Sequence, residues 1–221
     1  MTEEITFYTN PMSRGRIARW MLEEVGVPYC TVFLDYGPPM QTPDYRALNP
    51  MGKVPTIVHG ATVVTECAAI CAYLADAFPS AGLAPAPTER GNYYRWFFFG
   101  AGPLEAAVTN RALGVEVPEE RRGMVGYGSL ERVTDALEGA LSSRDYLAGD
   151  RFSAADVYVG AQVGWGMMFG SIEKRPALVA YWDRLKDRPA AIRARGLDDA
   201  AMPPKTEKAE PAKTEPAEAK S

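Results

Sequence analysis

Apolar and polar positions in the first part of the chain alternate in short, strand-like blocks. Ile5–Thr9 and Tyr29–Leu34 are rich in β-branched and aromatic residues, which predicts two strands. Between them, Arg14–Gly26 carries apolar residues at helical spacing and ends on a glycine, which predicts a helix. A strand, a crossover helix and a second strand form a β-α-β unit, so the two strands should be parallel.

Two more strands and another helix follow. Pro55–His59 and Ala61–Thr65 lie on either side of a turn at Gly60, which predicts an antiparallel hairpin. Glu66–Phe78 then carries an apolar stripe at helical spacing, and a short helical turn is expected near Asp44–Leu48. This part of the chain is therefore predicted to fold around a mixed sheet.

The remainder of the chain has the apolar period of helices. The predicted organisation is a mixed-sheet domain over residues 1–80, a linker over 81–88, an all-helical domain over 89–200 and a tail over 203–221. Helical stretches are expected at Glu89–Leu113, Pro118–Ser143, Ser153–Phe169 and Pro176–Pro189. The tail has no large apolar residue to bury, so we expect it to be disordered. The fold class is therefore an α+β/α arrangement of two domains.

Composition and charge exclude several kinds of partner. The net charge of −4 and the lack of a basic block argue against a nucleic-acid partner. The N-terminus is acidic and no apolar stretch is long enough to span a bilayer, so neither a signal peptide nor a membrane partner is expected. A single histidine, His59, and three cysteines, Cys30, Cys67 and Cys71, lack the pattern of a metal site or a Ser-His-Asp triad. We expect no bound metal, free thiols and a cytoplasmic location.

Three motifs together carry a resemblance to a known family. They are "NPMGKVPTIV" at Asn49–Val58, "VVTECAAICAYLADAFP" at Val63–Pro79 and "YLAGDRFSAADVYVG" at Tyr146–Gly160. In this order, and with a mixed-sheet domain followed by an all-helical one, the chain resembles the bacterial cytosolic glutathione transferases everywhere except in its tail. The resemblance implies a thioredoxin-like first domain, glutathione as co-substrate and a homodimer.

The same resemblance implies a glutathione site around a proline. Val54 and Pro55 resemble the cis X-Pro unit of thioredoxin-like domains, in which the main-chain groups before the proline face the ligand. The Val54 N–H and C=O would bond to the cysteinyl unit of glutathione as an added strand does. Lys53 would pair with the glycyl carboxylate and Glu66 with the γ-glutamyl ammonium group. Ordinary first-turn helix charge is the alternative explanation for Glu66.

Cys67 stands where the family usually has a serine. The resemblance places it beside the γ-glutamyl carboxylate, in the first turn of a helix that Thr65 could cap. A thiol is a weaker donor than a hydroxyl, so the carboxylate would depend more on backbone N–H groups. We expect the Cys67 thiol to face the empty site and to react with alkylating reagents before Cys30 and Cys71.

The group that activates the glutathione thiol has three candidates near the end of the first strand. Ser13 directly precedes the predicted helix and resembles the catalytic serine of some family members, although a plain helix cap satisfies the same position. Tyr8, at the strand end, resembles the catalytic tyrosine of other members, and Asn10 is a third option. No Cys-x-x-Cys lies in this segment, so dithiol oxidoreductase chemistry is not expected.

The expected activity is conjugation or reduction of small apolar electrophiles by the glutathione thiolate, in a detoxifying role. A glutathione-dependent peroxidase or lyase on the same scaffold and a non-catalytic interaction protein are the alternatives. Tyr93–Phe99 is too aromatic for one buried stripe, so a second face should contact a partner subunit or an apolar substrate. Val163–Gly170 adds methionines of the kind that promiscuous apolar sites use. Ser153 and Asp156 have the spacing of a helix capping box, which serves folding.

Overall fold

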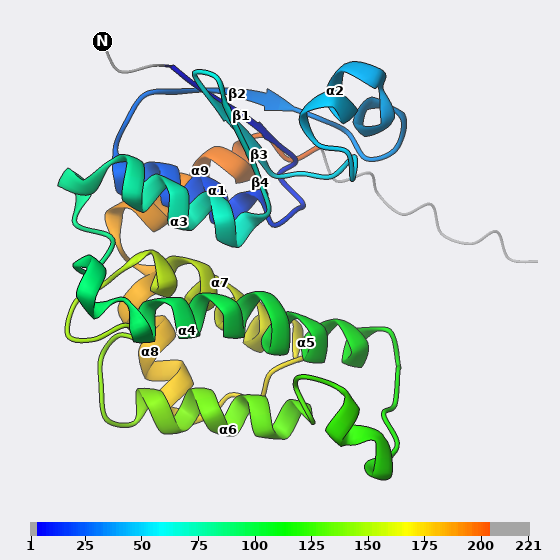
Figure 1. Ribbon diagram of the computed structural model, residues 1–221, viewed down its shortest axis with the longest axis vertical. Helices are drawn as coiled ribbons and strands as arrows, with labels where there is room; N and C mark the ends of the chain where they lie inside the picture. The colour runs from blue at the N-terminus through cyan, green and yellow to red at the C-terminus, as the bar shows by residue number, and fades with distance from the viewer. Residues whose placement is uncertain (1–3, 204–221) are drawn as a thin grey trace, which may run out of the picture.

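The computed structural model describes residues 4–203 of the 221-residue chain. A domain built on a four-stranded sheet packs against an all-helical domain (Figure 1). This arrangement confirms the predicted fold class. Apart from Pro203, the tail expected over residues 203–221 lies outside the described residues.

The sheet is mixed, as the sequence pattern predicts. Its strands are β1 (Ile5–Thr9), β2 (Tyr29–Phe33), β3 (Thr56–His59) and β4 (Thr62–Thr65). Their order is β2-β1-β3-β4, with β1 parallel to β2 and antiparallel to β3, and with β3 and β4 paired as an antiparallel hairpin. The third strand begins one residue later than expected, at Thr56 rather than Pro55, because a proline has no N–H to donate to the ladder.

Helices α1 (Gly15–Val25) and α3 (Cys67–Ala77) cover one face of the sheet, and α2 (Pro43–Leu48) lies at one end of the strands (Figure 1). Phe7 of β1 and Ile57 of β3 are directly opposite each other in the ladder and are fully buried on the face beneath these two helices. Burial of such alternate apolar side chains is what holds α1 and α3 on the sheet.

The second domain contains helices only, among the residues that the structure describes. They are α4 (Gly91–Phe99), α5 (Glu105–Ala112), α6 (Leu130–Leu141), α7 (Ala154–Phe169), α8 (Pro176–Lys186) and α9 (Pro189–Ala200). Helix α7 is buried along almost its whole length and packs against α1 and α3 as well as against α4 and α8. It is therefore the central helix of the molecule.

Two predicted helices are shorter than the pattern indicates. The expected helix Glu89–Leu113 is divided into α4 and α5 by a π-helical segment, Gly100–Leu104, which contains Pro103. A proline inside a helix lacks the N–H of a regular turn, and the wider segment accommodates it. The expected helix Pro118–Ser143 becomes regular only at α6, whose N-cap Ser129 accepts a hydrogen bond from the Arg132 N–H at 3.2 Å.

The sequence pattern does not predict α9, because its buried positions are alanines, which give a weak apolar signal. Ala190, Ala191 and Ala194 are its buried apolar residues, and the helix packs against α1. An ion pair fastens the two helices together: the Arg19 Nε donates to the Asp198 carboxylate at 2.7 Å, with both side chains buried.

The N-terminus of α7 carries the capping box that the sequence predicts. One Asp156 carboxylate oxygen accepts hydrogen bonds from the Ser153 N–H and hydroxyl, both at 2.9 Å. The other accepts from the Leu147 N–H at 2.8 Å and from the Tyr181 hydroxyl at 2.9 Å. Burial raises the pKa of Asp156, and these hydrogen bonds act in the opposite direction. One buried carboxylate thus joins the start of α7 to α8 and to the segment before it.

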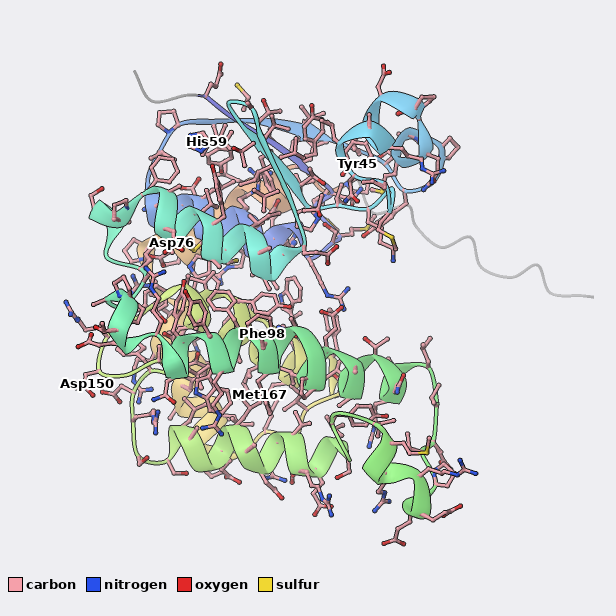
Figure 2. The ribbon with its side chains drawn as sticks, in the orientation of Figure 1. Tyr45, His59, Asp76, Phe98, Asp150 and Met167 are labelled. Atoms are coloured by element: carbon pink, nitrogen blue, oxygen red, sulfur yellow. The ribbon has the colours of Figure 1, made fainter. Side chains whose placement is uncertain are left out.

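Replacing Asp156 should destabilise the fold strongly. Asp156→Ala leaves the buried Leu147 N–H and Tyr181 hydroxyl without an acceptor, and each unpaired donor costs about 1–3 kcal/mol. We therefore expect the free energy of unfolding, measured with urea, to fall by about 3 kcal/mol. The control is Asp150→Ala, at an exposed position in the segment before α7 (Figure 2), which should change the free energy of unfolding by less than about 0.5 kcal/mol. Equal effects of the two substitutions would contradict this account.

Candidate active site

The loop between β1 and α1 presents Ser13 at the start of a helix. Its hydroxyl donates to the Asn10 carbonyl oxygen at 2.7 Å and accepts from the Gly15 N–H at 2.9 Å. The chain must pass close to the end of β1 here, since a Cβ at Gly15 would lie 1.9 Å from the Thr9 hydroxyl oxygen. Only glycine fits at that point, so Ser13 is held beside the positive end of the α1 dipole.

The other two candidates for thiol activation have different surroundings. The Asn10 side chain is buried in the loop, where its amide donates to the Leu34 carbonyl at 2.8 Å and accepts from the Met12 N–H at 2.9 Å. These bonds make Asn10 a support of the loop. Tyr8 is half-buried, and its ring packs against that of Tyr45 on α2, with centroids 5.5 Å apart.

The predicted proline motif is at the edge of the ladder. The Val54–Pro55 peptide bond is cis, as expected, and the pairing of β3 with its neighbours begins only at Thr56. The Lys53 carbonyl oxygen accepts hydrogen bonds from the Tyr45 hydroxyl and from the Asn49 side-chain amide at 2.7 Å. These contacts fix the backbone of the motif, while the Lys53 side chain is exposed.

Glu66 has a backbone conformation that is unusual for a residue other than glycine. It is the N-cap of α3 and, among the described residues, the one non-glycine residue with a positive φ, at 64°. The expectation that Thr65 caps this helix is therefore wrong, since the chain turns at Glu66 itself. A large residue in this conformation is costly and persists only where its surroundings enforce it, which is common at functional sites. The Glu66 side chain is exposed.

A pocket of about 860 Å³ lies where the two domains meet. Of the predicted site residues, Ser13, Lys53 and Val54 line it, whereas Tyr8, Pro55, Glu66 and Cys67 are outside its lining. Its apolar walls come from both domains and include Met12, Tyr36, Met40, Trp165, Met168 and Phe169. The structure thus brings a serine hydroxyl, a lysine and free strand-edge backbone to one side of an apolar, methionine-rich cavity.

Comparison with known proteins decides the family. The family model "Glutathione S-transferase, N-terminal domain" matches residues 12–77, and "Glutathione S-transferase, C-terminal domain" matches residues 126–189. Glutathione S-transferase F10 of Arabidopsis thaliana is 30% identical over 204 residues, which cover 84% of this chain and 94% of the relative. This chain belongs to the glutathione S-transferase family.

Further relatives agree with this assignment. Glutathione S-transferase GST-4.5 of Xanthomonas campestris is 30% identical over 170 residues, covering 72% of this chain and 83% of the relative. The crystal structure of a theta class glutathione S-transferase from Xanthomonas axonopodis pv. citri, with glutathione bound, has a TM-score of 0.69. It is 33% identical and covers 88% of this chain and 97% of its own. The chain is a glutathione transferase.

The cysteines of this transferase are not placed as expected. Cys67 is only 7% exposed, and its thiol turns inward and donates to the Arg14 carbonyl oxygen at 3.5 Å. Cys71, one turn further along the same buried face of α3, is fully buried, and burial raises its pKa. The exposed thiol is Cys30, which donates to the Glu4 carboxylate at 2.8 Å. The expectation that the Cys67 thiol is exposed to the site is therefore wrong, while the order in which the three thiols react stays a prediction.

Two residues of the pocket escape prediction from the sequence. Arg14 and Glu105, which starts α5, form an ion pair of 3.0 Å across the two domains, and both line the pocket. They lie far apart in the sequence, so no local pattern connects them. The arginine immediately after Ser13 is the one signal that could have drawn attention to this pair.

The described residues contain no cluster of three or more histidine, cysteine, aspartate or glutamate side chains able to hold a metal ion. The Nδ1 atom of the single histidine, His59 (Figure 2), lies 2.9 Å from the Tyr73 hydroxyl, away from the pocket lining. Over the same part of the chain, none of the helices has the length and apolar character that a membrane crossing requires.

Proposed function

We propose that this transferase binds glutathione along the Ser13, Val54 and Lys53 side of the pocket and uses its thiolate to conjugate or reduce apolar electrophiles. The observation that carries the proposal is the composition of the pocket. One side supplies a hydroxyl at a helix N-terminus, an unpaired strand edge and an ammonium group, and the other supplies large apolar side chains. These are the two half-sites that a thiol co-substrate and an apolar electrophile need.

Glutathione would lie antiparallel to the Val54 segment. Val54 is outside the strand ladder, so its main-chain groups can bond to the cysteinyl unit as a strand edge does. The exposed Lys53 ammonium group suits the glycyl carboxylate, and the exposed Glu66 carboxylate suits the γ-glutamyl ammonium group. Because the Cys67 thiol is turned inward, we assign to Cys67 only its backbone N–H, at the positive end of α3.

Ser13 would activate the thiol. A free thiol has a pKa of about 8.5 and is only a few per cent ionised at about pH 7. Lowering this pKa by about 2 requires the site to stabilise the thiolate over the thiol by about 2.7 kcal/mol. A hydrogen bond to a charged acceptor supplies about 1.5–3 kcal/mol, and the α1 dipole adds to it. The hydroxyl hydrogen that now faces the Asn10 carbonyl would turn to the sulfur when the thiolate forms. Tyr8 is the rival candidate.

The electrophile would bind against the wall formed by Trp165, Met168 and Phe169 of α7. Methionine side chains are flexible and polarisable, so this wall can adapt to apolar molecules of different shapes. The thiolate sulfur forms the new bond while the electrophile loses a leaving group or accepts the electron pair. Detoxification of such compounds in a reducing cytoplasm, where the free cysteines persist, is the setting that we propose.

We also propose that the enzyme is a homodimer that meets its partner through α4. Phe98 is 74% exposed on this helix (Figure 2), and Tyr94, one turn earlier, is also exposed. Val63, on the edge strand β4, is a separate exposed apolar side chain. Large apolar residues grouped on a surface usually mark an interface, and an edge strand is a liability unless it is covered.

Separate substitutions of Ser13 and Tyr8 distinguish the two candidates for thiol activation. Ser13→Ala should lower kcat by roughly one to three orders of magnitude, the range for one donor to a developing negative charge. The KM for glutathione should change little, because its carboxylates and main-chain bonds remain. Tyr8→Phe is the matched control and should keep near wild-type turnover in a steady-state assay with an apolar electrophile. If Tyr8→Phe abolishes turnover and Ser13→Ala does not, the tyrosine is the activating group.

Charge introduced on α4 should separate the proposed subunits. Phe98→Glu buries a carboxylate in an apolar interface, so we expect a monomer in analytical ultracentrifugation where the wild type is a dimer. Met124→Glu, at a position that is 76% exposed in the segment before α6, is the control and should leave the dimer intact. A wild-type monomer, or a dimer that Phe98→Glu does not disturb, would refute this interface.

A further inference from the structure

Two of the three cysteines lie together at the start of α3. Cys67 is the first residue of this helix and Cys71 is one turn further along, and both belong to its buried face. Residues four apart on a helix are neighbours, with Cβ atoms about 5–6 Å from each other. Burial raises the pKa of the Cys71 thiol, and its hydrogen bond with the Cys67 thiol raises it further. The two thiols are therefore adjacent, and the proposed transferase reaction uses neither.

The surroundings of this pair are closed and mostly apolar. Cys71 is fully buried and Cys67 is 7% exposed, and Ile70 and Leu74 belong to the same buried face of α3. Burial raises the pKa of Tyr158 on α7, and the neighbouring Cys67 and Cys71 raise it further, so its hydroxyl lies near both thiols. The two cysteines thus form a dithiol inside the seam between the domains.

A disulfide does not fit this dithiol. A disulfide needs Cβ atoms about 3.5–4.5 Å apart, whereas a regular helix holds residues of this spacing about 5–6 Å apart. Both cysteines are free thiols within the regular part of α3. Closing the bond would require the first turn of the helix to distort. The spacing instead leaves room for one atom that bridges the two sulfur atoms.

Ligand number and charge decide which bridging atom suits the dithiol. A structural zinc ion needs more ligands than two cysteines provide, and the described residues offer no group of three or more histidine, cysteine, aspartate or glutamate side chains. Copper(I) between two thiolates gives an anionic complex, and an unpaired charge is costly to bury. A trivalent arsenic atom with one organic substituent forms two covalent bonds to sulfur, and the product is neutral. The buried apolar surroundings favour the neutral product.

We propose that Cys67 and Cys71 form a binding site for monosubstituted trivalent arsenicals, in which the arsenic atom bridges the two sulfur atoms. The site is additional to the proposed function and does not depend on it. An arsenoxide, R–As=O, reacts with both thiols to give the bridged product and water. Two As–S bonds and two O–H bonds form, while the As=O bond and both S–H bonds break. Arsenic stays trivalent and the sulfur atoms are not oxidised, so the reaction needs no oxidant or reductant.

The start of α3 provides the way in. Cys67 is the first residue of the helix, directly after the turn at Glu66, whose φ is 64°. The ends of helices open locally at a lower free-energy cost than their interiors. Cys67 therefore bonds to arsenic first, and Cys71 then closes the chelate. The second bond forms within one molecule, which makes the chelate far more stable than a bond to a single thiol.

The experiment is a titration with phenylarsine oxide, followed by intact-protein mass spectrometry and by a count of free thiols with dithiobis(nitrobenzoate) in denaturant. We expect each chain to take up a single phenylarsenic group and to lose two of its three free thiols. Excess glutathione, a monothiol, should not remove the group. Dithiothreitol should remove it, because a second dithiol forms a chelate of its own.

Single substitutions test whether both sulfur atoms take part. Cys67→Ser and Cys71→Ala each leave only one thiol of the pair, so we expect binding to weaken at least about a hundredfold. The matched control is Cys30→Ser, which removes the exposed thiol on β2 and should keep tight binding. Circular dichroism and urea unfolding on the same samples establish that each variant is folded.

The outcomes are distinct. Tight binding that resists glutathione and requires both Cys67 and Cys71 supports the proposal. Folded single variants that bind as tightly as the wild type overturn it, and so does a wild type that glutathione strips of arsenic. Loss of tight binding in Cys30→Ser assigns the arsenical to the exposed thiol and also overturns it. Glutathione binding by the untreated wild type is measured separately by calorimetry, so failure of this site and failure of the proposed function are told apart.

Discussion

The buried ion pair between Arg19 and Asp198 fixes how the two domains of this transferase meet. The Arg19 side chain is 3% exposed and that of Asp198 is 0%, and their charged groups are 2.7 Å apart. The Arg19 guanidinium also lies over the ring of Phe7, 5.1 Å from its centroid, so the link extends from α9 through α1 to the sheet. Breaking such a pair leaves an uncompensated buried charge, at a cost of about 3–5 kcal/mol. The register of α9 on α1 is therefore strongly determined.

The pocket depends on this register because its walls belong to both domains. Helix α1 carries the Ser13 loop at its N-terminus, and Met202, just beyond α9, also lines the pocket. The opposite wall is the C-terminal part of α7, whose first turn is held by the buried Asp156. Two buried carboxylates thus position the elements that carry the polar and apolar sides of the site. Ser13 and the Arg14–Glu105 ion pair lie where these two sides of the pocket meet.

Local patterns in the sequence predict most of the secondary structure of this molecule. They do not predict features that depend on contacts between residues far apart in the chain. The β-α-β unit, the hairpin and the Ser153–Asp156 capping box are each specified by neighbours in the chain, so they could be predicted. The direction of the Cys67 thiol could not be predicted, because it depends on how the turn at Glu66 starts α3. A shift of one residue in the start of this helix decides whether the side chain is exposed or buried. At Glu66, local preference gives way to a conformation that the surroundings impose, as functional sites often require. The ion pairs of Arg14 and Arg19 join segments that only the tertiary fold brings together.

The central claim is that glutathione occupies the side of the pocket formed by Lys53 and Val54 and that its γ-glutamyl end extends to Glu66. The most direct test is titration calorimetry of glutathione with the wild type, Lys53→Ala, Glu66→Gln and the exposed control Lys174→Ala. A hydrogen bond to a charged group contributes about 1.5–3 kcal/mol, and 1.4 kcal/mol is about tenfold in Kd. We predict saturable binding of one glutathione per subunit to the wild type, weakened about tenfold or more by each of the two site substitutions and unchanged in the control. Absence of binding to the wild type, or equal affinity in all four proteins, would contradict the account.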